Sequence, residues 1–355
     1  MRYWSRITRR LVAAAGLAAA IGLAGSASAA TLVVANKSEA TVSLVDIATR
    51  EIRATLAVGE GPHEVAVSPD GRLALVGIYG TRAAPGSSLA LIEIPAARVA
   101  RTIPLGEYRR PHGIVWLADN RRAVVTAEAN RALLVVDTLA GRVEAAVDTD
   151  QDVSHMVAVT PDGSRAFVAN IRSGSVTVVD LAERRRLAQV PTGAGAEGVA
   201  VTPDGATVWV TNRAADTLTV MDARSLAVLA TLESPSFPIR AAVTVDGRRV
   251  LVTHARSADL AVYHVASRSL ERRLDLQLQA SQMAGRLFGD TFGSSSVPIG
   301  IALTPDGRTA FVAHSNADLV SVVDLQSWTV TGTLAAGKEP DGMGVSPLVV
   351  PPAGK

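Results

Sequence analysis

A short segment recurs seven times along this chain. Each copy begins with small residues or proline, continues as an alternating apolar stretch and, in most copies, ends in Pro-Asp-Gly. The equivalent turn positions are 49, 43, 42, 42, 60 and 42 residues apart, at Asp70, Asp119, Asp162, Asp204, Asp246, Asp306 and Leu348. A period just above forty residues with several strands per unit is typical of propeller blades. The sequence therefore predicts an all-β, seven-bladed β-propeller.

Each repeat reads as four antiparallel strands. The segment VAVSPDGRLALV (65–76) is a hairpin, because proline presets φ, aspartate bonds nearby backbone and glycine adopts positive φ. An apolar third strand follows, as in SVTVVDL (175–181), and then a more polar outer strand, as in RRRLAQVPT (184–192). Charged side chains on an outer strand protect a sheet edge from pairing with other chains. We expect the outer strand of each blade to be this polar one.

The two ends of the repeat region predict how the ring closes. Segment 31–46 reads as a second and a third strand, whereas 342–347 reads as an innermost strand without partners. Pairing of the last strand with the first blade would join the ends and leave only short edges. We therefore expect residues 31–355 to form one propeller.

Residues 1–30 resemble an export signal. Four arginines precede an apolar run at 11–23, and Ala27-Ser28-Ala29 fits a signal-peptidase site. The run is too short for a comfortable membrane span, and no second run follows. Thr8-Arg9-Arg10-Leu11-Val12 also resembles a twin-arginine signal, without its usual Phe-Leu pair. We expect a periplasmic or secreted protein without a membrane span, exported by the general or the twin-arginine route.

Composition excludes several classes of partner and site. Removing residues 1–30 takes four arginines and no acidic residue from the 35 basic and 33 acidic side chains, which leaves a net charge of −2. No basic field then remains for nucleic acid or anionic lipid. The chain has no cysteine, which excludes thiol chemistry and thiolate metal ligands. A small molecule or a periplasmic protein is the expected partner, and the sequence leaves the oligomeric state open.

Three of the repeats carry a further recurring motif, in FVANIRSGSVTVVD (167–180), WVTNRAADTLTVMD (209–222) and VVANKSEATVSLVD (33–46). With the Pro-Asp-Gly turns, these segments resemble the YVTN family of β-propeller repeats. The resemblance covers essentially all of the chain after residue 30 and implies the propeller fold. Related propellers include lactonase-like hydrolases, the nitrous oxide reductase propeller with its histidine-ligated copper cluster, and proteins that handle d-type haem. The resemblance does not choose among these functions.

Two columns of equivalent positions should surround the mouth of the central channel. The position after the proline at the start of each innermost strand gives His63, His112, His155, Glu197, Ile239, Ile299 and Asp341. The next position gives Glu64, Gly113, Met156, Gly198, Arg240, Gly300 and Gly342. Three histidines therefore come from three consecutive blades. We expect a binding site at this mouth.

The chemistry expected at this mouth follows from the side chains in the two columns. Imidazoles with a carboxylate suit Zn, Cu or Fe, so His63, His112 and His155 are candidate metal ligands. The alternative is that these histidines cap neighbouring strands and bond loop backbone. Glu64 and Arg240 either handle a ligand carboxylate or phosphate, or form a salt bridge across the mouth. Haem is a further candidate cofactor.

A third column lies in the loop between the second and third strands, on the same face. It reads Asn36, Tyr79, Ala127, Asn170, Asn212, His254 and His314. Asparagine suits the left-handed turn expected there. We therefore list Tyr79, His254 and His314 as further ligand-binding candidates, with two alternatives. In the first alternative, Tyr79 packs beneath the inserted loop and binds no ligand. In the second, His254 and His314 are tolerated replacements of asparagine and bind no ligand.

Two insertions fall on the face that carries the candidate site. Segment 278–297 is long for a propeller loop, and we expect a short helix in it with Leu278, Met283, Leu287 and Phe288 on one side. Segment 79–88 lengthens another loop. The sequence thus favours a periplasmic propeller that binds a ligand, cofactor or partner protein at a histidine-rich mouth. The alternatives are a lactonase-like hydrolase or lyase, and a protein that handles a metal or d-type haem through His63, His112 and His155.

Overall fold

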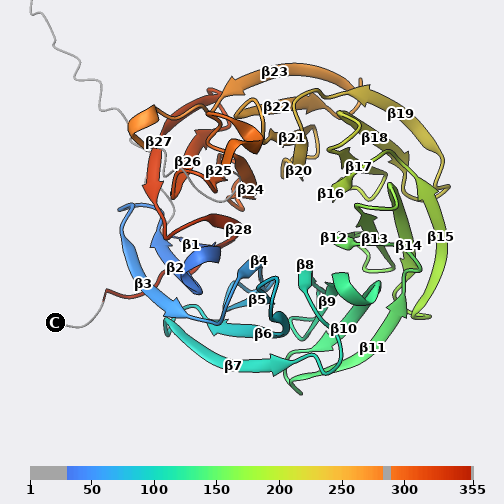
Figure 1. Cartoon of the computed structure of the whole chain (residues 1–355), viewed down its shortest axis with the longest axis horizontal. Coiled ribbons are helices and arrows are strands. Elements are labelled where there is room, and N and C mark those ends of the chain that lie inside the picture. The colour runs from blue at the N-terminus through green and yellow to red at the C-terminus, as the bar shows by residue number, and fades with distance from the viewer. Residues whose placement is uncertain (1–29, 283–288, 353–355) are drawn as a thin grey trace, which may run out of the picture.

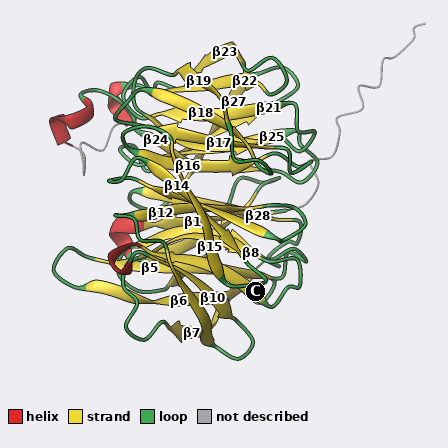
Figure 2. Cartoon of the chain, turned by 90° about the vertical axis from the view of Figure 1, so that its right-hand side faces the viewer, coloured by secondary structure: helices red, strands yellow, loops and turns green. Residues whose placement is uncertain are grey.

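The strands of this chain form seven four-stranded antiparallel sheets in a ring, in a computed structural model that describes residues 30–282 and 289–352 (Figure 1). The innermost strand of each sheet faces the ring axis and the outermost strand forms the rim. Viewed from the side, the molecule is a disc, with connecting loops on its two flat faces (Figure 2). The seven-bladed propeller predicted from the repeats is therefore confirmed.

Each sheet forms one blade, and the strands of a blade run in order from the axis outward. Blade 1 consists of β28 (Pro340–Ser346), β1 (Thr31–Asn36), β2 (Thr41–Asp46) and β3 (Ile52–Ala57). Blade 2 consists of β4 (Pro62–Val67), β5 (Leu73–Gly80), β6 (Pro85–Glu93) and β7 (Arg98–Pro104). Blade 3 consists of β8 (Pro111–Trp116), β9 (Arg122–Ala127), β10 (Ala132–Asp137) and β11 (Arg142–Asp148).

The remaining blades follow in chain order. Blade 4 consists of β12 (Ser154–Val159), β13 (Arg165–Asn170), β14 (Ser175–Asp180) and β15 (Arg185–Pro191). Blade 5 consists of β16 (Ala196–Val201), β17 (Thr207–Asn212), β18 (Thr217–Asp222) and β19 (Val228–Glu233). Blade 6 consists of β20 (Pro238–Val243), β21 (Arg249–His254), β22 (Asp259–His264) and β23 (Ser269–Asp275). Blade 7 consists of β24 (Pro298–Leu303), β25 (Thr309–His314), β26 (Leu319–Asp324) and β27 (Thr329–Ala335).

The ring closes as the chain ends predicted. Strand β28 pairs antiparallel with β1, with Thr31 opposite Ser346 and Val33 opposite Gly344. The Thr31 hydroxyl adds a bond to the Leu348 carbonyl at 2.8 Å. Blade 1 therefore joins strands from both ends of the repeat region.

The Pro-Asp-Gly turns repeat one hydrogen-bond pattern. In blade 5, the Thr202 hydroxyl donates to Asp204 Oδ1 at 2.6 Å, and the Ala206 amide donates to the same oxygen at 2.9 Å. Gly205 closes the turn with a φ of 69°, a conformation that costs glycine little. The same hydroxyl-to-aspartate bond occurs in the turns of Asp70, Asp162, Asp246 and Asp306. These aspartates are thus turn residues.

The apolar core lies between neighbouring blades. One cluster combines Phe167 and Val178 of blade 4 with Val199 and Val210 of blade 5, all of them buried. The innermost strands β4, β8, β24 and β28 also line an open hollow of about 370 Å³. Burial of both sheet faces explains why the inner strands read as nearly continuous apolar runs.

Short 3-10 segments interrupt the loops on the face that carries the mouth. They are η1 (Lys37–Glu39), η2 (Glu128–Asn130), η3 (Ala280–Gln282) and η4 (Gly289–Phe292). Segment 278–297 connects β23 to β24, as predicted, and its described part holds η3 and η4 in place of one helix. Met283, Leu287 and Phe288 lie outside the described residues, as do residues 1–29. In the described ranges, no helix has the length and apolarity needed to cross a membrane.

Candidate functional site

The three predicted histidines lie together at the channel mouth. His63, His112 and His155 occupy the second position of β4, β8 and β12. Ring centroids are 4.1 Å apart for His63 and His112, and 3.5 Å apart for His112 and His155. His112 is fully buried between the other two rings, whose residues are 8–9% exposed. Equivalent positions of consecutive blades thus produce a stack of imidazoles.

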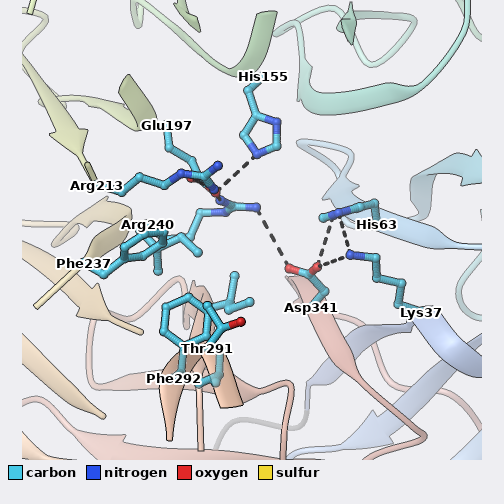
Figure 3. A pocket seen from close by; sticks show the side chains of 13 residues that line it. Lys37, His63, His155, Glu197, Arg213, Phe237, Arg240, Thr291, Phe292 and Asp341 are labelled. Atoms are coloured by element: carbon cyan, nitrogen blue, oxygen red, sulfur yellow. Dashed lines mark hydrogen bonds and ion pairs between the residues drawn. The ribbon is translucent and has the colours of Figure 1, made fainter. Parts of the chain in front are cut away.

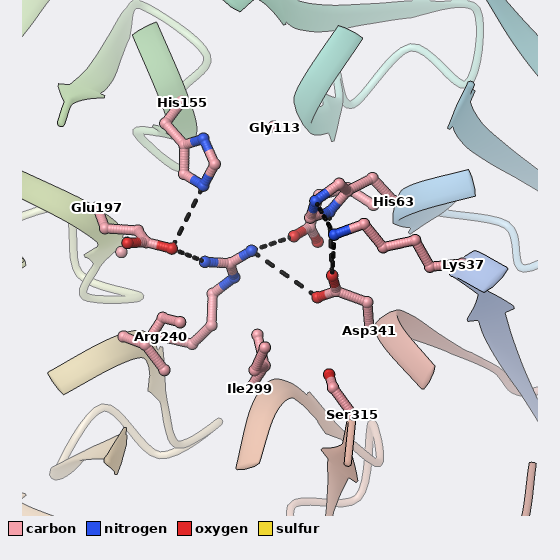
Figure 4. A network of polar contacts seen from close by, with 12 residues as sticks. Lys37, His63, Gly113, His155, Glu197, Arg240, Ile299, Ser315 and Asp341 are labelled. Carbon is pink, nitrogen blue, oxygen red and sulfur yellow. Dashed lines mark hydrogen bonds and ion pairs between the residues drawn. The ribbon is translucent and has the colours of Figure 1, made fainter. Parts of the chain in front are cut away.

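Arg240 spans the mouth from blade 6. Its Nη2 lies 2.6 Å from Glu64 Oε1, its Nη1 lies 3.0 Å from Glu197 Oε1, and Asp341 Oδ1 is 4.0 Å from Nη2 (Figure 4). The four residues are all buried. The salt bridge that the sequence offered as one role of Glu64 and Arg240 is therefore present, and it joins β20 to β4 across the axis.

Three charged residues of the mouth were not predicted from the sequence. Lys37 Nζ lies 3.0 Å from His63 Nε2, Glu128 Oε2 lies 3.6 Å from His155 Nδ1, and Arg213 Nη1 is paired with Glu197. Each of the three directly follows a position of the third column, namely Asn36, Ala127 and Asn212. Since successive side chains of an extended chain point to opposite sides, an inward asparagine directs the next residue to the mouth. This alternation of side chains was the sequence signal that could have identified Lys37, Glu128 and Arg213 as residues of the mouth.

Tyr79 does not occupy the position that the sequence assigned to it. In blade 2, Pro62 pairs with Ile78, whereas Pro111 of blade 3 pairs with Ala127. Ile78 is therefore the equivalent of the asparagines, and Tyr79 falls one position later. The spacing agrees with this pairing, because Ile78 lies eight residues after Asp70, as Asn170 lies eight after Asp162, whereas Tyr79 lies nine after Asp70 and so points the opposite way along the strand. Consequently the Tyr79 ring reaches the mouth, 5.1 Å from His63 and 5.7 Å from His112.

His254 and His314 lie inside their own blades, away from the three stacked histidines. His314 Nδ1 lies 2.8 Å from Ser296 Oγ, and its Nε2 lies 2.8 Å from Ser321 Oγ. Both nitrogens therefore have a serine partner, one in segment 278–297 and one in β26 of blade 7. His254 has Ser234 Oγ at 2.8 Å from Nε2, and Asp259 Oδ1 at 3.0 Å from Nδ1. Neither residue is exposed, so the geometry favours the replacement of asparagine over ligand binding.

The third column explains this substitution. Asn170 Nδ2 donates to Thr177 Oγ1 at 3.0 Å, and Asn212 Nδ2 donates to Thr219 Oγ1 at 3.0 Å. The acceptor lies seven residues later in both blades, as Ser321 does after His314. The histidine therefore performs the same bridging of two strands as the asparagine.

Burial and neighbouring charges shift the pKa values of the three stacked imidazoles in different directions. Burial, with the charges of Lys37 and Arg240, holds the pKa of His63 well below its usual range. Burial and the neighbouring histidines lower the pKa of His112 in the same way. Burial also opposes protonation of His155, but the carboxylates of Glu128 and Glu197 outweigh it and raise its pKa. The surroundings thus favour the neutral form of His63 and His112, whereas the two carboxylates favour the protonated form of His155.

The acidic groups of the mouth differ as well. Burial would raise the pKa of Glu197, but His155 and the arginines outweigh it and lower the value to about 2. Burial raises the pKa of Glu64 despite the attraction of Arg240. Burial also raises the pKa of Tyr79, to about 12, so its hydroxyl stays protonated. The mouth therefore holds ionised Glu197 beside Arg240, and a neutral phenol.

A cavity of about 320 Å³ opens beside this network (Figure 3). Its polar wall holds Lys37, His63, His155, Glu197, Arg213, Arg240 and Asp341. Its apolar wall holds Phe237, Ile239, Val297, Ile299 and Phe292, with Thr291 beside them. The rings of Phe237 and Phe292 meet edge to face at 5.1 Å. Thr291 and Phe292 belong to segment 278–297, so the insertion contributes a wall of this cavity.

The cavity exposes its cations more than its anions. The side chains of Lys37 and Arg213 are 23% and 31% exposed, whereas those of Glu197 and Asp341 are 3% exposed. Lys37 lies 3.7 Å from Asp341, and Arg213 is paired with Glu197, so each cation covers an acid. A molecule entering the cavity therefore meets positive charge first.

Comparisons with known proteins agree with the fold. The family profile described as Cytochrome D1 heme domain matches residues 118–245, which is less than half of the chain. The propeller is similar to Hydrazine Synthase of Kuenenia stuttgartiensis, with a TM-score of 0.67 and 17% identity over 81% of this chain and 90% of that one. It is also similar to a functionally unknown protein of Desulfotomaculum acetoxidans, with a TM-score of 0.74 and 16% identity over 89% and 98% of the two chains. No curated protein matches the sequence.

The matched segment covers part of the site. Residues 118–245 include His155, Glu197, Arg213 and Arg240, but neither His63 nor His112. The structural similarities are below 25% identity and support the propeller fold alone. The assignment of the repeats to the YVTN family stays a prediction from the sequence.

Proposed function

We propose that this chain is a binding propeller whose channel mouth takes a small molecule with an anionic group and an apolar body. The observation that carries this proposal is the division of the 320 Å³ cavity into a cationic and an apolar wall. Small-molecule sites occupy roughly 300–1,000 Å³ and combine apolar lining with a few polar groups. The cavity has both properties.

The cationic wall would bind the anionic group. Arg213 presents a planar guanidinium that can form two parallel bonds to a carboxylate, and Lys37 adds a point charge on the opposite side. Arg240, which is bound to Glu64 and Glu197, stays in place and keeps those acids from repelling the ligand. Binding thus exchanges the Arg213 and Lys37 contacts with buried acids for contacts with the ligand.

The apolar wall would hold the body of the ligand. Phe237 and Phe292 form its aromatic part, and Ile239 and Ile299 form its floor. The guanidinium of Arg213 lies 5.3 Å from the Phe237 ring centre, which places the charge at the border of the apolar wall. A molecule with its anionic end next to its apolar body would match this border.

The test compares two probes of the same shape. We expect 4-phenylbutyrate to bind the mature chain in calorimetry, and the neutral 4-phenylbutan-1-ol to bind at least about tenfold more weakly. Arg213→Gln should bring the carboxylate down to the affinity of the alcohol. Arg172→Gln, an exposed arginine outside the cavity, serves as the matched control. Equal binding of the two probes, or full affinity in Arg213→Gln, would contradict the proposal.

Export of the protein belongs to this proposal too. The arginines, apolar run and Ala27-Ser28-Ala29 site of residues 1–30 support a cleaved signal and a periplasmic or secreted location. Mass spectrometry of the protein from its periplasmic fraction should give a chain that begins near Ala30 or Thr31. An uncleaved chain in the cytoplasm would contradict this location.

A second candidate is a haem-type cofactor, which the Cytochrome D1 heme domain match favours. The donor chemistry fits, because a haem has carboxylates for Arg213 and Lys37, an apolar macrocycle for Phe237, and iron that imidazoles bind. His63 and His155 line the cavity and would be the residues that hold the iron. Bound haem would supply a redox-active iron at the mouth.

The chain's own residues set what such a cofactor would require. His155 would have to turn away from Glu197, 3.4 Å from its Nε2, and His63 would have to turn away from Lys37. A titration with hemin, followed by its Soret absorbance, should show one equivalent bound and a changed spectrum in His63→Ala or His155→Ala. An unchanged spectrum in both variants would contradict binding of the iron by these histidines. The lactonase-like alternative stays a prediction.

A further inference from the structure

His112 is a buried histidine whose ring nitrogens have no hydrogen-bond partner in the described structure. The residue is fully buried, and neither Nδ1 nor Nε2 has a donor or acceptor within bonding geometry. Buried polar groups of native proteins nearly always have a partner, and each exception needs an explanation. By contrast, the buried His314 bonds through both nitrogens. The different treatment of these two histidines points to a ligand for His112.

Two further ligand-bearing side chains lie next to it. Ligand atoms of His63, Glu64 and His112 all lie within 4.8 Å of one another. Metal bonds of ~2.0–2.2 Å in a tetrahedral site place ligand atoms roughly 3.4 Å apart, so shifts of about an ångström would complete the set. Arg240 binds only Oε1 of Glu64, and a carboxylate has a second oxygen for a metal. The three residues come from β4 and β8, which contact each other directly.

His155 does not belong to this set, although the sequence placed it there. Its Nδ1 lies 3.6 Å from Glu128 and its Nε2 lies 3.4 Å from Glu197, so a buried carboxylate stands beside each nitrogen. His63 differs, because a carboxylate, Asp341 at 3.2 Å, lies beside Nδ1 alone, and the neighbour of Nε2 is the partly exposed Lys37. Its ring stacks on His112 at 3.5 Å and covers that residue from the side of blade 4. Glu64 takes the place that the sequence gave to His155.

Lys37 already places a cation beside the set. Its Nζ lies 3.0 Å from His63 Nε2, with Asp341 Oδ2 at 3.7 Å and Glu339 Oε1 at 3.9 Å. This surrounding of one imidazole and two carboxylates stabilises positive charge. Because the Lys37 side chain is 23% exposed, it can leave toward solvent. A metal bound through Nε2 of His63 would therefore compete with this ammonium.

We infer that His63, Glu64 and His112 form a site for a divalent transition-metal ion, with the Lys37 ammonium as its built-in competitor. Two imidazoles and one carboxylate are the donor set that zinc, iron and copper take, and a three-ligand set leaves a position open to a further ligand. The site shares His63 and Lys37 with the cavity of the proposed function, but its three donors do not depend on the ligand of that cavity.

The experiment titrates the mature chain, freed of metal by a chelator, with Co²⁺ and Zn²⁺. We expect one Co²⁺ per chain with the visible absorption of a low-coordinate site, and displacement of cobalt by Zn²⁺. Loss of a ligand in His112→Ala or Glu64→Gln should weaken binding by at least about 100-fold. Lys37→Gln should strengthen it by about tenfold, because it removes a competing charge.

Three controls separate this site from its surroundings. His264→Ala removes a histidine at the end of β22, outside the mouth, and should leave the cobalt affinity unchanged. His155→Ala should weaken it far less than His112→Ala does. Arg213→Gln, which disables the cavity, should leave it within about twofold. The gain in Lys37→Gln cannot arise from misfolding, so it tests the site even if a histidine variant is unstable.

Several results would overturn the inference. These are no stoichiometric cobalt binding, full affinity in His112→Ala, or weaker binding in Lys37→Gln. A loss in His155→Ala equal to that in His112→Ala would equally overturn the assignment of Glu64 in place of His155. Loss of phenylbutyrate binding with intact cobalt binding would instead refute only the proposed function.

Discussion

At the scale of single residues, the mouth is organised by Arg240. One guanidinium, buried to 5% exposure, neutralises Glu64 and Glu197, which come from blades on different sides of the ring. Asp341 Oδ1 lies 4.0 Å from Nη2 of the same guanidinium. Breaking a buried ion pair from one side leaves an uncompensated charge, and the penalty exceeds the net worth of the pair. Arg240 is therefore the residue whose loss the mouth tolerates least.

Arg240→Met should lower the free energy of unfolding by about 3–5 kcal/mol, because Glu64 and Glu197 lose their shared counter-charge. Urea unfolding followed by circular dichroism measures this. The triple variant with Glu64→Gln and Glu197→Gln should recover most of the loss. Arg256→Met, outside the network, is the control. A loss below about 1 kcal/mol would show that the ion pairs of Arg240 with Glu64 and Glu197 do not stabilise the fold.

His314 gives a prediction in pH. Burial lowers its pKa to about 3, so the folded chain keeps this ring neutral. The unfolded chain protonates it near pH 6.5, and stability therefore falls as the pH decreases from about 6.5 toward 3. The contribution has a slope of up to about 1.4 kcal/mol per pH unit.

His314→Asn should remove that contribution. Asparagine can donate to Ser321 as Asn170 donates to Thr177, so stability at pH 7.5 should change by less than about 1 kcal/mol. Below pH 6, the difference in unfolding free energy should move in favour of the variant. Parallel curves for the two proteins between pH 4 and 7.5 would refute a neutral buried ring.

At the scale of elements, ring closure depends on β28. This strand pairs with β1 along its length and also packs against β4 and β24, its neighbours around the axis. Without it, β1 would expose an unpaired edge, and the buried Met343 would leave its core cluster. The first blade would then be a three-stranded sheet with no inner strand.

A chain truncated after residue 338 should therefore lose cooperative unfolding or associate through the open edge of β1. Size-exclusion chromatography with light scattering and thermal melts tests both outcomes. A synthetic peptide of residues 338–352, added in trans, should restore a monomeric species with a single transition. A truncated chain that is monomeric and as stable as the full one would show that β28 does not close the ring.

The elements also show where sequence reasoning succeeds. The Pro-Asp-Gly turns recur because one hydroxyl and one glycine fix each of them locally, so their spacing revealed blade number and strand order. The position of Tyr79 was wrong because it lies nine residues after the turn aspartate Asp70, whereas the equivalent position lies eight residues after it, at Ile78, as the pairing of Ile78 with Pro62 shows. The internal structure of 278–297 was predicted only as a loop with a helix, and the described part holds two 3-10 turns.

At the scale of the whole molecule, the ring converts equivalent positions of different blades into neighbours. Sequence alone brings His63, His112 and His155 to one mouth once seven blades are assumed, because each occupies the same place in its unit. It does not say which side chains reach across the axis, since that depends on side-chain length and ring diameter. Arg240 touching Glu64, 176 residues away, is a product of the closed ring.

The same consideration explains which candidates the ring brings together. His254 and His314 share a face of the disc with the mouth, yet their side chains point into their blades, where serine partners occupy them. Lys37, Glu128 and Arg213 were absent from the prediction although they line or support the mouth. Strand alternation decides both outcomes, and it follows from pairing that a single sequence shows only indirectly.

The proposed function rests on a channel mouth with a cationic and an apolar wall. A crystal structure of the mature chain grown with 4-phenylbutyrate tests it most directly. We expect the carboxylate to lie beside Arg213 and Lys37, and the phenyl ring to pack against Phe237 and Phe292. The probe bound elsewhere on the molecule, or a mouth in which these side chains fill the cavity themselves, would contradict it.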